Sequence, residues 1–196
     1  MKLIFISGPS GSGKTTLSKQ IIRKSKNGYI LSTDNYYKVG LISKLLSKFV
    51  KGYFDKSISF NHKLFNRDFN FILKNGISIY ERSYNFEKKT INNFINETNN
   101  IDFLIIEGIF AKEFSSRLSN INYFFLELKI NKNKCMKRVV DRDLRERGKV
   151  KKQAEDDFLK SWEIYYEKFK NIKNNSNEFI ITNKTNIDQI LKKLFE

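Results

Sequence analysis

The chain has 196 residues, a formal net charge of +16, and hydrophobic residues at 40% of its positions. That length suits one compact domain with a small lid, and the apolar fraction is enough to fill a core, which excludes a disordered protein. The most apolar stretch, residues 103–106, is far shorter than the roughly 20 residues of a membrane span. The single cysteine, Cys135, excludes a disulfide framework, and glycines follow the first apolar residues too soon for a signal peptide. We therefore expect a cytoplasmic protein.

Strand-like and helix-like segments alternate along the chain, which predicts an α/β fold with a mainly parallel central sheet flanked by helices. A polar run over 149–157 leads into an aromatic-rich helix that ends near Lys170, and the polar residues 173–178 form a loop too short to divide domains. We therefore expect residues 1–196 to form one domain. The expected strands are 2–6, 29–32, 77–80, 103–106, 123–129 and 179–181, and the other expected helices are 14–24, 131–146 and 187–195.

A glycine-rich motif follows the first predicted strand and opens the first predicted helix. Residues 8–15 match the pattern G-x-x-x-x-G-K-[ST] at each fixed position. Glycines let the backbone curl so that N–H groups point at phosphate oxygens, and the helix N-terminus adds a partial positive charge. The motif predicts a nucleoside-triphosphate site in which Lys14 reaches the β- and γ-phosphates and the Thr15 hydroxyl binds Mg²⁺. The expected nucleotide contacts are Gly8, Ser10, Gly11, Ser12, Gly13, Lys14, Thr15 and Thr16.

The sequence does not favour a GTPase, another class of protein that uses this loop. Residues 183–186 begin like the guanine-reading motif N-K-x-D, but the fourth position is Asn186. The strand at 103–106 is followed by Glu107 and Gly108 rather than by the aspartate of a D-x-x-G switch. We therefore expect a phosphotransferase with ATP or GTP as donor and Mg²⁺ as cofactor.

Two carboxylates follow predicted strands directly. Asp34 comes after the strand at 29–32, and Glu107 ends the strand at 103–106. Ligands of open α/β sheets bind at the carboxyl ends of the strands, so Asp34 is placed to accept a proton from an acceptor hydroxyl. Glu107 is placed to hold Mg²⁺ through water or to orient the acceptor. A helix cap for Asp34 and a solvated strand end for Glu107 are the alternatives.

The segment 142–149 carries a dense set of basic side chains. If it closes over the nucleotide as part of a lid at approximately 142–160, Arg142 and Arg147 neutralise charge on the transferring phosphoryl group. A solvated helix face with local ion pairs is the alternative. The net charge of +16 is compatible with a nucleic-acid partner, but Lys and Asn replace Arg and Ala almost everywhere, as A/T-rich codons would produce.

Five further motifs follow the phosphate loop in order. They are Ser32-Thr33-Asp34-Asn35-Tyr36-Tyr37, Tyr53-Phe54-Asp55 with Phe60-Asn61, Tyr84-Asn85-Phe86, Ile105-Ile106-Glu107-Gly108-Ile109, and Arg142-Asp143-Leu144-Arg145-Glu146-Arg147-Gly148. The first is similar to S-x-D-x-F-Y, and the last fits R-D-x-x-E-R-G at each fixed position. In this order the motifs resemble the uridine kinase family, a branch of the P-loop kinases that includes phosphoribulokinase. The resemblance covers residues 8 to about 149.

The resemblance implies a kinase that phosphorylates the 5′-hydroxyl of a pyrimidine nucleoside, uridine or cytidine. It implies that Asp34 is the catalytic base, with Lys14, Arg142 and Arg147 as the other catalytic residues. The implied acceptor contacts are Tyr37, Phe54, Asp55, Tyr84, Lys89 and Arg142, and the implied metal contacts are Thr15 and Glu107.

The chain departs from the family pattern mainly where the family reads its acceptor. Asn85 replaces an aspartate, and Lys89 stands where the family has a histidine that reads the pyrimidine. Further departures are Ser57, Asn61, Val139 and Asp157. Another small alcohol, such as pantothenate, nicotinamide riboside or a sugar phosphate, is therefore the alternative acceptor, and Lys89 would suit an anionic one. A nucleic-acid-binding ATPase is less favoured, and a homo-oligomer is left open.

Overall fold

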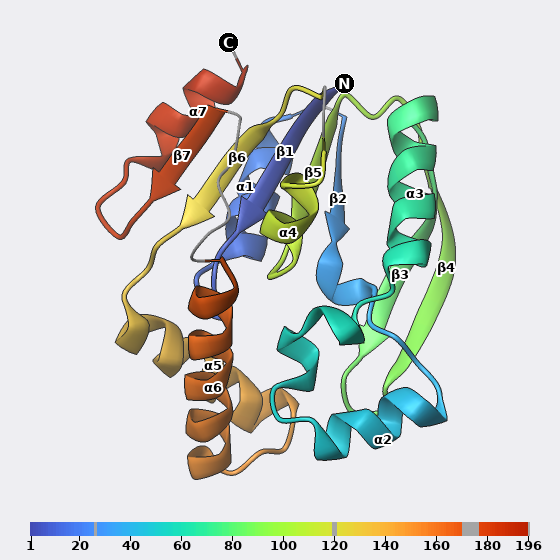
Figure 1. Cartoon of the computed structure of the whole chain (residues 1–196). Coiled ribbons are helices and arrows are strands. Elements are labelled where there is room, and N and C mark those ends of the chain that lie inside the picture. The colour runs from blue at the N-terminus through green and yellow to red at the C-terminus, as the bar shows by residue number, and fades with distance from the viewer. Residues whose placement is uncertain (26, 119–120, 170–176, 196) are drawn as a thin grey trace.

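A parallel sheet forms the centre of the molecule, as Figure 1 shows for the computed structural model. The structure describes residues 1–25, 27–118, 121–169 and 177–195. Every neighbouring pair of strands in this sheet is parallel. The prediction of an α/β fold with a mainly parallel central sheet is confirmed. Across the described residues the strand order is β2 (Gly28–Ser32), β5 (Phe103–Glu107), β1 (Lys2–Ser7), β6 (Phe124–Leu128) and β7 (Asn177–Ile181).

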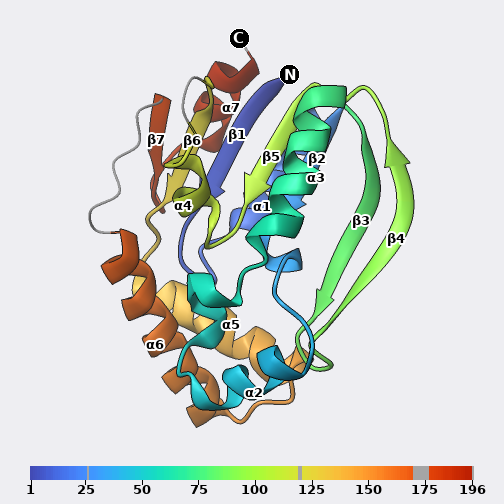
Figure 2. The same ribbon diagram turned by 45° about the vertical axis from the view of Figure 1, so that its right-hand side comes forward.

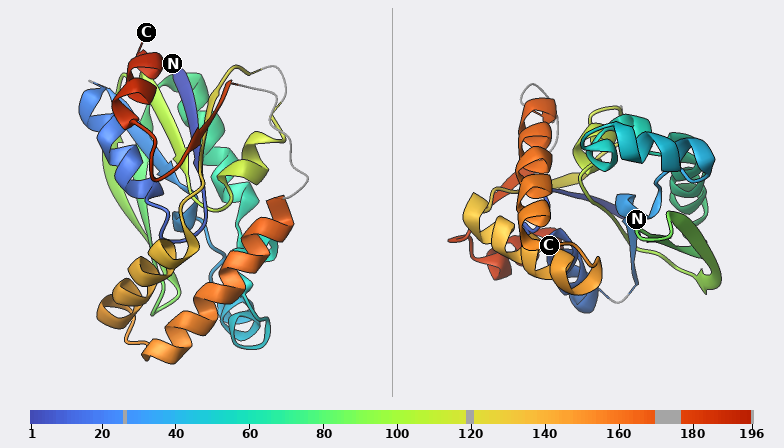
Figure 3. Two further views of the ribbon diagram at one scale, coloured as in Figure 1. Left: turned by 90° about the vertical axis from the view of Figure 1, so that its left-hand side faces the viewer. Right: turned by 90° about the horizontal axis from the view of Figure 1, so that it is seen from below.

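Each face of the sheet is buried under its own helices, which explains why the strands are apolar throughout. Along β1, Leu3 and Phe5 belong to one hydrophobic cluster, whereas Ile4 and Ile6 belong to another. Figure 3 shows the helices on either side of the sheet. The Ile4 side is covered by α1 (Lys14–Lys24) and α7 (Ile187–Phe195), and the Phe5 side by α3 (His62–Asn75) and α4 (Ala111–Ser115).

A second group of elements lies beside the sheet and below the carboxyl ends of its strands (Figures 1 and 2). Figure 2 shows the antiparallel hairpin standing apart from the main sheet, beyond α3, with its tip beside α2. Asn131 caps α5 because its side chain accepts hydrogen bonds from the backbone N–H groups of Asn133 and Lys134. The elements of this group are α2 (Leu41–Phe49), β3 (Ser78–Asn85), β4 (Thr90–Thr98), α5 (Lys132–Glu146) and α6 (Lys151–Phe169), with 3₁₀ turns at Thr33–Asn35, Tyr53–Asp55 and Ser57–Ser59.

Four helices and strands of the described residues were not predicted, namely α2, α3, α4 and β4. The strand expected at 77–80 is longer and forms β3, and α6 begins at Lys151, inside the expected polar run. Within the expected loop at 173–178, residues 173–176 lie outside the described part of the chain, and Glu178 belongs to β7. The predicted end of the aromatic helix at Lys170 also lies outside the described residues.

The helix α6 places part of its aromatic stripe in the core. Tyr165 and Phe169 are buried, and the hydroxyl groups of Tyr165 and Ser7 lie 3.0 Å apart. Trp162 is half-buried and Tyr166 is exposed. No helix in the described part of the chain is long and apolar enough to cross a membrane.

Candidate active site

The phosphate loop joins β1 to α1 and packs tightly against α5. Gly11 has a φ of +77°, and a Cβ atom at this position would lie 2.5 Å from the carbonyl oxygen of Cys135 and 2.9 Å from Val139 Cγ2. Arg138 also donates a hydrogen bond of 3.1 Å to the carbonyl oxygen of Gly11. Only glycine satisfies both the backbone conformation and the close approach of α5.

Polar groups inside the loop are arranged to receive an anion. Lys14 is buried, and its Nζ donates hydrogen bonds of 2.9 Å to the Gly8 carbonyl and 3.1 Å to the Pro9 carbonyl. Burial is the main cause that lowers the pKa of Lys14. The buried Oγ of Ser12 has no hydrogen-bond partner among the described residues. An orphaned donor and an ammonium group held by carbonyls both fit a bound triphosphate.

Two carboxylates stand close together beside the loop. Glu107, at the end of β5, accepts hydrogen bonds from Ser32 Oγ at 2.7 Å and from Thr15 Oγ1 at 3.4 Å. Burial raises the pKa of Glu107, the negative charge of Asp34 raises it further, and Lys14 lowers it. Because Glu107 is only 3% exposed, the alternative of a solvated strand end is wrong.

Asp34 lies in the 3₁₀ turn that follows β2. Its Oδ1 atom is buried and has no hydrogen-bond partner in the described part of the chain. The turn containing Asp34 has no side-chain cap, and the residue that precedes α2 is Gly40, so the helix-cap alternative is wrong. A buried acceptor without a partner is costly and fits a ligand hydroxyl at this point.

Oxygen donors at the loop fit Mg²⁺. Thr15 and Glu107 supply a hydroxyl and a carboxylate, the hard ligands that this ion takes alongside phosphate oxygens and water. The described residues contain no group of three or more His, Cys, Asp or Glu side chains that could hold a metal ion by themselves. This pattern suits an ion that arrives with a nucleotide.

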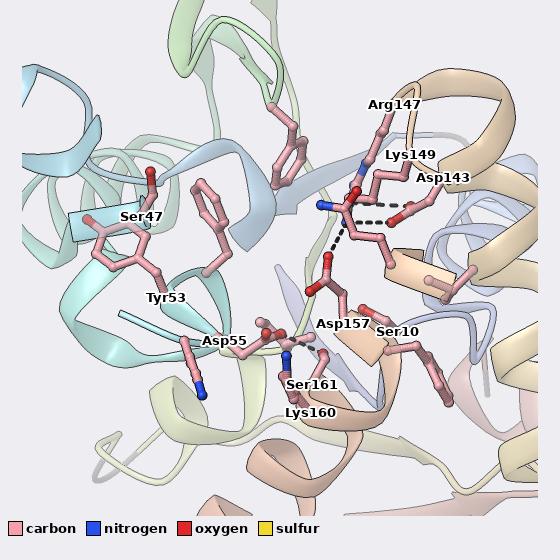
Figure 4. Close-up of a pocket in the computed structure, with 18 of the residues that line it drawn as sticks. Ser10, Ser47, Tyr53, Asp55, Asp143, Arg147, Lys149, Asp157, Lys160 and Ser161 are labelled. Carbon is pink, nitrogen blue, oxygen red and sulfur yellow. Dashed lines mark hydrogen bonds and ion pairs between the residues drawn. The ribbon is translucent and has the colours of Figure 1, made fainter. Parts of the chain in front are cut away.

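A cavity of about 540 Å³ opens below these groups (Figure 4). Asp34 and Ser10 line it at the end nearest the sheet. An aromatic wall is formed by Tyr37, Phe54 and Phe86, whose ring centroids lie 5.2–5.7 Å apart. Tyr84 packs behind this wall, 5.0 Å from the Phe86 centroid, and is 6% exposed.

Cationic side chains from the last turns of α5 and from the residues that follow it line the same cavity. Arg142 donates to Asp143 Oδ1 at 2.9–3.0 Å, and Lys149 donates to Asp143 Oδ2 at 2.9 Å. The guanidinium of Arg147 lies 4.3 Å from the Phe86 ring centroid and 3.5 Å from Asp143. The arginines therefore make local ion pairs and also line the cavity.

Two polar pairs connect elements that are far apart in the sequence. Asp55 accepts a hydrogen bond of 2.6 Å from Ser161 Oγ of α6, and burial raises the pKa of Asp55. Lys89, in the hairpin turn, donates a hydrogen bond of 2.6 Å to Ser47 Oγ of α2.

Eight of the predicted site residues line this cavity, and the rest of the phosphate loop lies outside its lining. Tyr84 does not line it but supports its wall, Thr15 and Glu107 lie beside it, and the exposed Thr16 lies in the first turn of α1. Phe86 belongs to a quoted motif but was not predicted as a contact. Ser47 and Ser161 also line the cavity, and no motif in the sequence singled them out. Lys149, the last residue of the basic segment 142–149, lines it too but was given no role of its own. The predicted lining residues are Ser10, Asp34, Tyr37, Phe54, Asp55, Lys89, Arg142 and Arg147.

Comparison with known proteins agrees with this geometry. A sequence model of the phosphoribulokinase/uridine kinase family matches residues 3–188. The chain belongs to this family. Relatives include a uridine kinase of Leuconostoc citreum, which is 27% identical over 85% of this chain and 80% of that protein. A uridine kinase of Clostridium perfringens (strain 13 / Type A) is 29% identical over 98% of this chain and 94% of that protein.

The solved structures share the fold. A D-glycerate 3-kinase from Cryptococcus neoformans var. grubii has a TM-score of 0.63 at 12% identity, over 92% of this chain and 86% of that chain. Membership of the phosphoribulokinase/uridine kinase family makes this chain a phosphotransferase that uses a nucleotide as phosphate donor and an alcohol group of a small molecule as acceptor. The resemblance stated from the motifs is confirmed.

Proposed function

We propose that this kinase transfers the γ-phosphoryl group of ATP to the 5′-hydroxyl of a pyrimidine nucleoside. The observation that carries the proposal is the buried Oδ1 of Asp34, which lacks a partner among the described residues and lines a cavity of about 540 Å³ beside the phosphate loop. The uridine kinases among the relatives support a nucleoside as acceptor.

Asp34 acts as the general base in this proposal. Its free oxygen accepts the proton of the 5′-hydroxyl while that oxygen forms a bond to the γ-phosphorus. The bond from the γ-phosphorus to the bridging oxygen breaks, and its electron pair leaves with ADP. The proton passes from Asp34 to solvent when the product departs.

The chain supplies positive charge on both sides of the phosphoryl group. Lys14 exchanges its two carbonyl partners for phosphate oxygens, and Arg142 and Arg147 approach from the C-terminal end of α5. Mg²⁺, when bound, neutralises charge on the β- and γ-phosphates. Thr15 would hold the ion directly, and Glu107 would hold it through water.

The acceptor is positioned by the aromatic wall and by Asp55. Phe54 and Phe86 present apolar ring faces on which a flat base can stack. The Asp55 carboxylate is held by Ser161 and has further acceptor capacity for ribose hydroxyls. Burial raises the pKa of Asp55 because the charged carboxylate loses contact with water, and the hydroxyl groups of a bound acceptor would supply hydrogen bonds in its place.

A panel of acceptors tests the proposal. Purified protein is incubated with Mg²⁺ and ATP or GTP, and acceptor-dependent release of the nucleoside diphosphate is followed for pyrimidine nucleosides, pantothenate, nicotinamide riboside and sugar phosphates. We expect turnover with a pyrimidine nucleoside and a product phosphorylated at the 5′ position. Turnover with another class alone, or ATP hydrolysis stimulated by DNA or RNA without any acceptor, would contradict it.

A further inference from the structure

The charges that line the cavity are unevenly distributed. The carboxylates Asp143 and Asp157 stand beside Lys149 in the α5–α6 part of the lining, where they neutralise its charge. The wall formed by α2, residues 50–51 and the hairpin turn is lined by lysines, and Asp55, the next carboxylate along the chain, accepts a hydrogen bond from Ser161 of α6. Its charged residues are Lys48, Lys51 and Lys89.

Lys89 is the most constrained of these lysines. It is half-buried, and its ammonium group donates a 2.6 Å hydrogen bond to the neutral hydroxyl of Ser47. Its backbone has a φ of +53°, a conformation that non-glycine residues adopt rarely. The neutral hydroxyl of Ser47 cannot offset the positive charge of Lys89, so this side chain can still pair with an anion.

The phosphates of the nucleotide do not explain the positive charge of this wall, because other groups are placed to bind them. The phosphate loop and Lys14 are placed to bind the triphosphate. Arg142 and Arg147, at the C-terminal end of α5, are placed to neutralise the charge of the phosphoryl group in transfer. Figure 4 shows Ser47, the partner of Lys89, on the opposite side of the cavity from Arg147 and Lys149. Figures 1 and 2 show α2 and the hairpin tip below the carboxyl end of β2, where Asp34 lies.

We propose that Lys89 binds a negatively charged group, a carboxylate or a phosphate, on the end of the acceptor remote from the reacting hydroxyl. The inference rests on the proposed function, because the reacting hydroxyl is placed at Asp34. The preferred acceptor is then a ribose compound with an acidic group where uridine has a neutral base edge. Lys48 and Lys51 add positive potential to the same wall, which favours an anion over a neutral group.

Three acceptors that share a ribose 5′-hydroxyl test whether Lys89 binds an anion and whether that anion is a carboxylate or a phosphate. Uridine is neutral, 5-carboxyuridine carries a carboxylate on the outer edge of the pyrimidine, and ribose 1-phosphate carries a phosphate in place of the base. We expect kcat/KM to be at least tenfold higher for one of the anionic acceptors than for uridine, and the better anion identifies the source. We also expect the KM of that acceptor, but not that of uridine, to rise with salt.

The variant Lys89→Met removes the charge and keeps the length of the side chain. It should lower kcat/KM for the preferred anion at least tenfold, mainly through KM, and lower kcat/KM for uridine by a clearly smaller factor, because uridine presents no negative charge to Lys89. Lys88→Met is the matched control, because Lys88 is exposed, is adjacent to Lys89 and does not line the cavity. We expect this control to match the wild-type enzyme with all three acceptors.

The outcomes separate this inference from the proposed function. If uridine is the best acceptor and Lys89→Met does not affect the anions selectively, the inference is wrong while the pyrimidine kinase stands. If ribose 1-phosphate is the preferred substrate and neither nucleoside is turned over, the inference that Lys89 binds an anion holds. The proposal that the acceptor is a pyrimidine nucleoside is then wrong. Equal losses with all acceptors in Lys89→Met would show a structural role and overturn the inference.

Discussion

The variant Gly108→Ala tests how the carboxylate end of the site is held together. Gly108 follows Glu107 directly and has a φ of +133°. A Cβ atom at this position would lie well inside van der Waals distance of Thr33 Oγ1, 3.1 Å from Thr33 Cβ and 3.4 Å from Asp34 Oδ1. Thr33 is fully buried, so its side chain has little room to move.

Two costs add in this variant. A backbone conformation that alanine rarely adopts costs about 1–3 kcal/mol, and forcing a methyl group into packed surroundings costs about 1–3 kcal/mol more. The sum of about 2–6 kcal/mol is a large part of the stability of an ordinary protein, and it corresponds to a fall in Tm of about 5–20 °C for a chain of this length. Turnover should fall as well, because the displaced Thr33 precedes Asp34.

Thermal unfolding of four variants measures the two costs separately: Gly108→Ala, Gly148→Ala, Thr33→Ala and the double variant of Thr33 and Gly108. Gly148→Ala, at a φ of +60° with no described atom within 4 Å of the new Cβ, should lose only about 1–2 kcal/mol. Thr33→Ala combined with Gly108→Ala removes the overlapping hydroxyl and should recover about 1–3 kcal/mol in a double-mutant cycle. A Tm for Gly108→Ala no lower than that of Gly148→Ala, or the absence of recovery in the double variant, would refute this reasoning.

Two further substitutions test the groups around the triphosphate. Lys14→Ala should weaken nucleotide binding, measured by calorimetry, and lower turnover with it, and unchanged values would argue against the phosphate-loop assignment. Glu107→Gln tests the raised pKa of Glu107. Because the folded state binds this proton more tightly, wild-type stability should fall as pH rises from the ordinary value of 4.5 through the raised pKa. The difference in Tm between the ligand-free wild type and Glu107→Gln should follow that fall, and a difference that does not change with pH would contradict it.

The part of the site around the phosphate loop could be predicted because its residues lie next to one another in the sequence or directly after predicted strands. A strand, a glycine loop and a helix follow one another directly, and a parallel sheet places the ends of β2 and β5 beside that loop. Asp34 and Glu107 were therefore found from the residues that precede them. The register of β2 on β5 pairs Ser32 with Glu107, which brings the two carboxylate-bearing ends together.

The rest of the cavity depends on tertiary packing. Ser47 meets Lys89 across 42 positions, and Asp55 meets Ser161 across 106, so no local pattern contains either pair. The helix α2 exposes much of its apolar surface, with Leu41 at 85% and Phe49 at 76%, and β4 is exposed along most of its length. Hydrophobic periodicity reports which residues are buried, so it gave no prediction for α2 and β4. These two elements nevertheless build or support the wall of the cavity around Lys89.

The most direct test of the account is the effect of Asp34→Asn on binding and on turnover. Removal of a general base slows a reaction by about 10²–10⁴-fold, whereas the phosphate loop does not depend on this carboxylate. We expect the Kd for Mg²⁺–ATP to stay within about twofold of the wild-type value, the Tm not to fall, and kcat with the preferred acceptor to fall by at least 100-fold. Wild-type turnover in this variant would remove Asp34 from the mechanism and contradict the account.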